Sequence, residues 1–109
     1  MPSPLILVTG AAGYIASLLI PQLLARGYRV RALARQPERL KSRTWYPQVE
    51  MARGDVMQPE TLITALDGVQ TVYYLIHNMS FGRGYMSIEI AGARNFAEAA
   101  EKTGVEHII

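Results

Sequence analysis

The chain has 109 residues, half of them apolar, and a formal net charge of +2. This is the size of one domain with its own buried core. The arginines that carry the positive charge are scattered, unlike those of a nucleic-acid-binding surface. There is no cysteine and the two histidines are isolated, so disulfides and a Cys/His metal site are excluded. No apolar run approaches the roughly 20 residues that span a bilayer, and no signal peptide precedes the first predicted strand, so we expect a cytoplasmic protein with no membrane or nucleic-acid partner.

The stretch over residues 5–16, LILVTGAAGYIA, is the most informative part of the sequence. Its apolar run predicts a strand over residues 5–8, after which Gly10 permits a tight bend and the close approach of a ligand. Gly13 opens the next helix, whose first free N–H groups and positive dipole end form a ready site for a pyrophosphate. Ala16 is the third small residue. The spacing Gly10-x-x-Gly13-x-x-Ala16 therefore predicts a nucleotide-binding turn.

The rest of the chain alternates short β-rich runs with helical patterns. Hydrophobic periodicity, together with prolines at helix starts and glycines at helix ends, predicts helices over residues 14–26, 37–43, 59–66 and 86–103. Further strands are predicted over residues 29–34, 49–53 and 70–76, with a fifth begun at 105–109. The segment 77–85 has two glycines and no periodicity, so we expect a loop there.

Helical spacing also predicts which side chains face the sheet. In the helix over 59–66 these are Leu62, Ile63 and Leu66. In the last helix we expect an inner face of five residues: Ile88, Gly92, Phe96, Ala97 and Ala100. The run 70–76, QTVYYLI, is nearly all β-branched or aromatic, which predicts a central strand buried on both faces.

This alternation predicts an α/β fold in which a right-handed, doubly wound parallel sheet has the strand order 3-2-1-4-5. Ligands of such sheets lie across the carboxyl ends of the strands, where the order reverses. The glycine turn, Arg35, Asp55 and His77 each follow a predicted strand. We therefore expect them along one rim of the sheet.

Several blocks of the sequence resemble one protein family. The turn TGAAGYIA is similar to the T-G-x-x-G-x-x-G/A turn of the short-chain dehydrogenase/reductase superfamily. The blocks RVRALARQPERL, ARGDVMQPETLITALDGV, VYYLIHNM and GARNFAEAAEKTGVEHII resemble its atypical branches, close to the NmrA-like and extended epimerase groups. The resemblance implies a Rossmann fold that binds NAD(P).

The resemblance also implies where the parts of the dinucleotide would lie. Asp55 and Val56 would receive the adenine, and Leu75, Ile76 and His77 would lie along the ribose and nicotinamide half. The pyrophosphate would be held by the turn, at Gly10, Ala12, Gly13, Tyr14 and Ile15.

The choice between NADP and NAD depends on Arg35, which stands 25 positions after Gly10 at the end of the second predicted strand. NAD-preferring enzymes commonly have an aspartate or glutamate at this place, which accepts hydrogen bonds from the ribose 2′-OH. A guanidinium suits a 2′-phosphate instead. Arg39, one helical turn further on, adds to the same patch. We therefore predict NADP(H) as the cofactor, with NAD(H) as the alternative.

The catalytic pair of this family is not found in the sequence. Family enzymes generally use a tyrosine with a lysine four residues later, and no tyrosine here has a lysine at that distance. The chain resembles the amino-terminal portion of a larger protein, so we expect no catalytic residue in it and no turnover by this segment alone.

Three functions stay open for the chain. The first is the cofactor-binding segment of an NADP-dependent oxidoreductase or epimerase that acts on an unidentified small molecule. The second is a non-catalytic, NmrA-like dinucleotide sensor, and the third is a structural subunit. We also expect self-association through the edge of the unfinished fifth strand.

Overall fold

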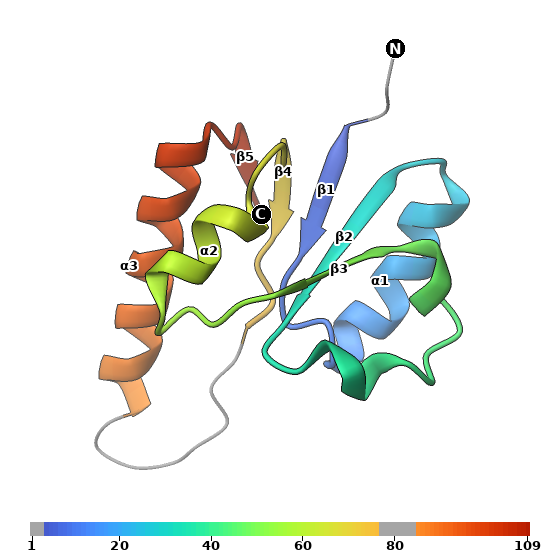
Figure 1. Cartoon of the computed structure of the whole chain (residues 1–109), viewed down its shortest axis with the longest axis horizontal. Helices are drawn as coiled ribbons and strands as arrows, with labels where there is room; N and C mark the ends of the chain where they lie inside the picture. The colour runs from blue at the N-terminus through green and yellow to red at the C-terminus, as the bar shows by residue number, and fades with distance from the viewer. Residues whose placement is uncertain (1–3, 77–84) are drawn as a thin grey trace.

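A computed structural model describes residues 4–76 and 85–109 of the chain. Its sheet consists of β1 (Leu5–Val8), β2 (Arg29–Ala34), β3 (Glu50–Arg53), β4 (Thr71–Tyr73) and β5 (His107–Ile108). Every pairing in the sheet is parallel, and the order is β3-β2-β1-β4-β5 (Figure 1). The predicted doubly wound sheet of order 3-2-1-4-5 is therefore confirmed.

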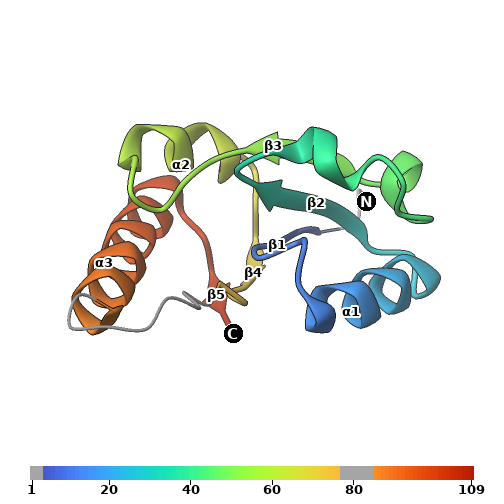
Figure 2. The same cartoon turned by 90° about the horizontal axis from the view of Figure 1, so that it is seen from below.

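Helices cover the two faces of this sheet. They are α1 (Tyr14–Ala25), α2 (Pro59–Ala65) and α3 (Tyr85–Thr103), with two short 3-10 helices, η1 (Pro37–Leu40) and η2 (Tyr46–Gln48), between β2 and β3. Figure 2 shows α1 on one face and α2 with α3 on the other. Within the described ranges, no helix is long and apolar enough to cross a membrane. The layers are therefore helix, sheet, helix, as the alternating sequence pattern predicts.

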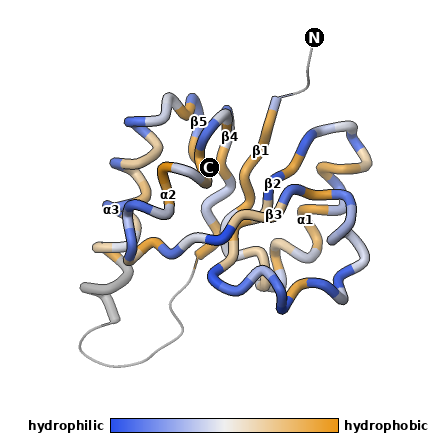
Figure 3. The backbone as a smooth tube through the Cα atoms, in the orientation of Figure 1, coloured by the Kyte–Doolittle hydropathy of each residue, from blue (hydrophilic) through white to orange (hydrophobic). Residues whose placement is uncertain are grey.

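Each face of the sheet has its own hydrophobic core, because successive side chains of a strand point to opposite faces. In β1, Leu5 and Leu7 belong to the core under α2 and α3, whereas Ile6 and Val8 belong to the core under α1. The apolar character runs along the whole of β1, at the centre of the sheet (Figure 3). On the α3 side, the rings of Tyr74 and Phe96 pack with centroids 4.9 Å apart.

Two of the predicted inward positions are wrong. Ile63 is 40% exposed, and α2 instead buries Leu62 and Ala65, one helical turn apart. In α3, Ala97 is exposed and Ala99 is buried beside Phe96 and Ala100. The prediction weighted side-chain type and spacing within one helix, whereas the angle at which each helix meets the sheet decides which face is buried.

The prediction for the fourth strand is also too simple. β4 is shorter than the predicted range 70–76, and Val72 is its one fully buried residue. Thr71 and Tyr73 are half-buried, and with Ile6 and Leu19 they line an open groove on the α1 face. The strand lies inside the sheet, but α1 packs mainly against β2 and leaves this face of β4 partly open among the described residues. The other shortened elements are the helix predicted over 37–43, which is the 3-10 helix η1, and the fifth strand, which spans two residues.

We predict that a glutamate destabilises the protein far more at Ala99, on the buried face of α3, than at Ala97, two positions earlier. Replacing Ala99 by glutamate should lower the free energy of unfolding by about 3 kcal/mol or more, because it buries an unpaired charge. The same replacement at Ala97 should cost less than about 1 kcal/mol, because that position faces water. Urea denaturation of both variants measures the difference. Equal losses would contradict the helix orientation described above.

Candidate functional site

Thr9 joins the ends of two neighbouring strands at the carboxyl edge of the sheet. Its backbone N–H and its hydroxyl both donate to the Tyr73 carbonyl, at 3.0 and 3.1 Å. The same hydroxyl oxygen accepts from the Leu75 N–H at 2.8 Å. Thr9 is fully buried, and its hydroxyl is satisfied as donor and acceptor. The sequence analysis did not assign it a role, and its place just before Gly10 was the available signal.

Gly10 lies where the backbone after β1 comes close to the backbone after β4. Its φ is +62°, and a Cβ built on it would lie 2.6 Å from the Leu75 carbonyl oxygen and 2.9 Å from the carbonyl carbon. No side chain fits this position without moving the backbone of Leu75. The sequence analysis explained Gly10 by the close approach of a ligand, and the structure adds the approach of a neighbouring strand end.

Gly13 is the residue directly before α1, and it precedes the free amides of the first helical turn. The Gly13 N–H donates to the Gly10 carbonyl at 2.9 Å, and the first bond of the helix runs from Ser17 to the Gly13 carbonyl. Among the described residues, no group accepts from the amides of Tyr14, Ile15 and Ala16. The helix has neither a capping side chain nor an acidic residue in its first turn. Its positive end is therefore open to an anion, which fits the pyrophosphate of a dinucleotide.

Large side chains around this helix start are exposed. Tyr14 is 77% exposed and Ile15 is 54% exposed, although both are largely apolar, while Ala16 is completely buried under the turn. Ala12 is exposed, and its carbonyl oxygen accepts from Arg43 Nη2 at 3.4 Å. Arg43 comes from the connector between η1 and η2, and the sequence analysis did not include it in the site.

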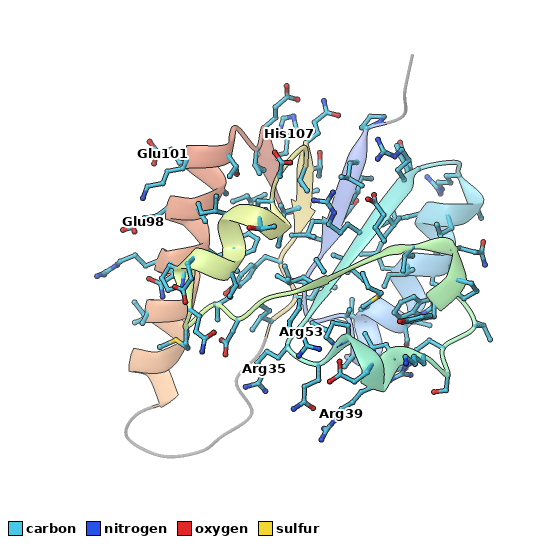
Figure 4. All side chains as sticks on the ribbon, viewed as in Figure 1. Arg35, Arg39, Arg53, Glu98, Glu101 and His107 are labelled. Atoms are coloured by element: carbon cyan, nitrogen blue, oxygen red, sulfur yellow. The ribbon has the colours of Figure 1, made fainter. Side chains whose placement is uncertain are left out.

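Three arginines gather at the carboxyl end of β2 and β3 (Figure 4). Arg35 directly follows β2, Arg39 lies in η1, and Arg53 is the last residue of β3. Arg35 and Arg39 are exposed, and neither has an ion-pair partner among the residues that the structure describes. Arg35 and Arg39 were predicted from the sequence to form this patch, whereas Arg53 was not. Its position follows from the register of the sheet, in which Arg53 pairs with Ala34, the residue before Arg35.

Asp55, in the segment after β3, forms hydrogen bonds within a local turn. Asp55 Oδ1 accepts from the Met57 N–H at 2.9 Å, and the Asp55 N–H donates to Thr61 Oγ1 at 2.9 Å. The first contact is a side-chain-to-backbone turn of the kind that aspartates commonly form, so Asp55 has a structural role here. The structure therefore supports a turn-forming function for Asp55, and its predicted contact with adenine stays a prediction.

Val56 is fixed by α3. Its carbonyl accepts from Asn95 Nδ2 at 2.7 Å, and a Cβ on Gly92 would lie 2.7 Å from Val56 Cγ2. The predicted inward position of Gly92 is confirmed, because α3 approaches this segment closely there. The sequence analysis missed Asn95, which carried no local signal because its partner lies 39 positions away in the chain.

Leu75 and Ile76 follow β4 at the same edge of the sheet and are half-buried. The structure thus brings the glycine turn, Arg35, the Asp55–Val56 segment and the end of β4 to the carboxyl ends of four parallel strands, on both sides of the point where the strand order reverses. His77 lies outside the described residues.

We predict that Gly10 is more sensitive to substitution than another glycine of positive φ. Gly10→Ala should lower the free energy of unfolding by about 2–4 kcal/mol, because the strain of a left-handed conformation adds to a clash with rigid backbone. Gly27 is the matched control, because its φ is +85° and nothing lies within 4 Å of its Cβ position. Gly27→Ala should cost only about 1 kcal/mol. Urea denaturation of both variants provides the measurement, and equal losses would show that the approach of Leu75 carries no cost.

Comparison with known proteins agrees with this geometry. The profile of a family described as NAD(P)H-binding matches residues 10–109. A 3 beta-hydroxysteroid dehydrogenase/Delta 5-->4-isomerase of Mycobacterium tuberculosis is 29% identical over 95% of this chain and 30% of its own length. Cinnamoyl-CoA reductase 1 of Oryza sativa subsp. japonica is 31% identical over 96% of this chain and 33% of its own length. The solved structure of Citrobacter sp. triphenylmethane reductase complexed with NADP(H) has a TM-score of 0.78 and 31% identity, covering 94% of this chain and 35% of that one.

The chain spans about a third of the length of these relatives. The family profile spans residues 10–109, the range in which the candidate site lies. The sequence resemblance is thereby confirmed. The chain belongs to the NAD(P)H-binding family, as a Rossmann domain of the extended short-chain dehydrogenase/reductase type.

Proposed function

We propose that this chain binds NADP(H) in preference to NAD(H), as the cofactor-binding segment of an oxidoreductase or epimerase that acts on a small molecule. The observation that carries the proposal is the exposed guanidinium of Arg35 at the carboxyl end of β2, with no carboxylate paired to it among the described residues. A carboxylate at this place would accept from the ribose 2′-OH and repel a 2′-phosphate, whereas a guanidinium attracts the phosphate. The complex of the Citrobacter relative with NADP(H) supports the same choice.

In this proposal the chain's own residues bind and orient the dinucleotide. The free amides at the start of α1 hold the pyrophosphate, with Tyr14 and Ile15 beside it. Arg35 and Arg39 receive the 2′-phosphate, and Asp55 and Val56 border the adenine. Leu75, Ile76 and His77 follow the ribose and nicotinamide half. When bound, the cofactor supplies hydride transfer.

We expect binding without turnover from this chain alone. No tyrosine in it has a lysine four residues later, so the acid that the family generally uses to assist hydride transfer is not supplied by this sequence. The same reasoning keeps a non-catalytic dinucleotide sensor as the second candidate function.

Self-association is a further part of the proposal. β5 pairs with β4 on one side, and Ile108 and Ile109 are 48% and 65% exposed. Among the residues that the structure describes, no strand pairs with the other side of β5. An apolar strand edge of this kind is a template for pairing with another chain, and we expect a second copy to use it.

We predict that a branched side chain at Gly13 blocks dinucleotide binding without unfolding the protein. The φ of Gly13 is −81°, which any residue adopts, and a Cβ there would lie 3.2 Å from the Gly10 carbonyl oxygen. Gly13→Val should raise the Kd for NADPH at least about 10-fold, because its methyl groups cover the charge-assisted hydrogen bonds of the helix start. Gly13→Ala should give a smaller increase. Calorimetry measures binding and far-UV circular dichroism checks the fold; an unchanged Kd in the valine variant would make the turn purely structural.

We predict that Arg35 sets the cofactor preference. Hydrogen bonds to a charged group contribute roughly 1.5–3 kcal/mol, so the wild type should bind NADPH about 10- to 150-fold more tightly than NADH. Arg35→Asp should remove or reverse this preference. Arg94→Asp is the control, because Arg94 is exposed on α3 and the change in net charge is the same. The dissociation constants of the wild type and of both variants for NADPH and for NADH, six in all, are compared at one salt concentration. Equal affinities in the wild type, or a preference that Arg35→Asp leaves intact, would exclude Arg35 from the site.

A further inference from the structure

The ion pair between Arg53 and Glu38 has no part in the function proposed above, although it lies beside Arg35. Arg53 Nη2 is 2.8 Å from Glu38 Oε2, and Arg53 Nη1 donates to the backbone carbonyl of Arg35 at 3.4 Å. The Arg53 side chain therefore reaches from β3 across the end of β2 to η1. Figure 4 shows it at the same edge of the sheet as Arg35 and Arg39. The ends of β2 and β3 thus bring together the guanidinium groups of Arg35, Arg39 and Arg53, and the Glu38 carboxylate is paired to the last of these.

This ion pair is weak enough to exchange partners. The side chains of Arg53 and Glu38 are 64% and 50% exposed, so water and salt screen the attraction between them. A phosphate monoester carries roughly −1.5 to −2 charges at neutral pH and offers three acceptor oxygens. A guanidinium binds such a group through two parallel, charge-assisted hydrogen bonds. Arg53 thus gains a stronger partner when a phosphate enters the edge that it shares with Arg35.

We propose that Arg53 is a second specificity-determining residue for NADP(H). When the cofactor binds, the Arg53 guanidinium breaks its ion pair with Glu38 and binds the 2′-phosphate. The Glu38 carboxylate therefore competes with the phosphate for Arg53. The inference rests on the proposed NADP(H) preference. NAD(H) has a hydroxyl at the same position and leaves the ion pair in place. Glu38 therefore lowers the affinity for NADP(H) alone and limits the preference that Arg35 creates.

The test is a double-mutant cycle with Glu38→Gln, Arg53→Gln and the double variant, in which the Kd values for NADPH and NADH are measured by calorimetry at fixed salt. Arg53→Gln should weaken NADPH binding about 3- to 10-fold, a modest loss because the side chain is exposed. Glu38→Gln should strengthen NADPH binding about 2- to 5-fold, because it frees Arg53. NADH binding should change less than about 2-fold in each variant, because NADH has no group for Arg53 to bind. Glu38→Gln should give a clearly smaller gain when Arg53 is also replaced.

Glu50→Gln is the matched control. The Glu50 side chain is also 50% exposed and pairs with arginines across the same two strands, since its Oε2 lies 3.5 Å from Arg29 Nη2 and its Oε1 lies 3.6 Å from Arg31 Nη2. Glu50 begins β3, whereas Arg53 ends it, so these ion pairs lie at the opposite edge of the sheet. The control should leave both affinities unchanged. Far-UV circular dichroism and the Tm of each variant exclude unfolding as the cause of an effect.

The outcomes separate this inference from the function on which it rests. A wild type that binds NADPH and NADH equally, with no effect of Arg35→Asp, would overturn both. If Arg35→Asp removes the preference and Arg53→Gln leaves it intact, the inference alone is wrong. A gain from Glu38→Gln that is equally large without Arg53, or that Glu50→Gln reproduces, would show a general charge effect and would overturn the exchange of partners.

Discussion

The hydroxyl of Thr9 is the contact on which the arrangement of the site depends. It donates to one residue of the β4 end and accepts from another, so it joins segments that lie 64 and 66 positions away in the chain. A buried hydroxyl that lost either partner would carry a desolvation cost, which favours this one geometry. Because the two strand ends are held together, residue 10 lies so close to the Leu75 carbonyl that only a glycine fits there. The turn at Gly10 and the start of α1 at Gly13 follow from this constraint.

The two sides of the candidate site differ in what they offer a ligand: positive charge on the α1 side and a fixed backbone segment on the α3 side. On the α1 side, the free amides of a 12-residue helix and the guanidinium groups after β2 and β3 have the same sign of charge, so the edge as a whole attracts anions. On the α3 side, Asn95 and Gly92 hold the Asp55–Val56 segment close to the helix. In the binding mode that we propose, the phosphates of the dinucleotide would lie at the charged side of the edge and its adenine would lie at the backbone that α3 holds.

The structure gives Asp55 and Arg53 contacts that the sequence pattern did not predict. Asp55 uses one carboxylate oxygen to close its own turn, which is a local requirement of a strand that ends in Gly54-Asp55. Arg53 received no assignment from the sequence, because a single arginine in a short strand has no distinctive spacing. Its importance depends on β3 lying beside β2 in one register, which brings it to the carbonyl of Arg35.

The order of the elements, the parallel sheet and the glycine turn could be predicted from the sequence, and so could the places of Arg35 and Arg39 after the second strand, because these depend on local signals. Periodicity, prolines at helix starts and glycines at helix ends act within a few residues. The packing of the layers, in contrast, buries Ala99 and exposes Ala97, leaves one face of β4 partly open, and brings Thr9, Asn95 and Arg53 to the candidate site. Each of these depends on how a helix lies on the sheet or on partners between 15 and 66 positions away. Patterns within a few residues do not indicate contacts between residues so far apart in the chain, because these contacts form only when the helices pack on the sheet.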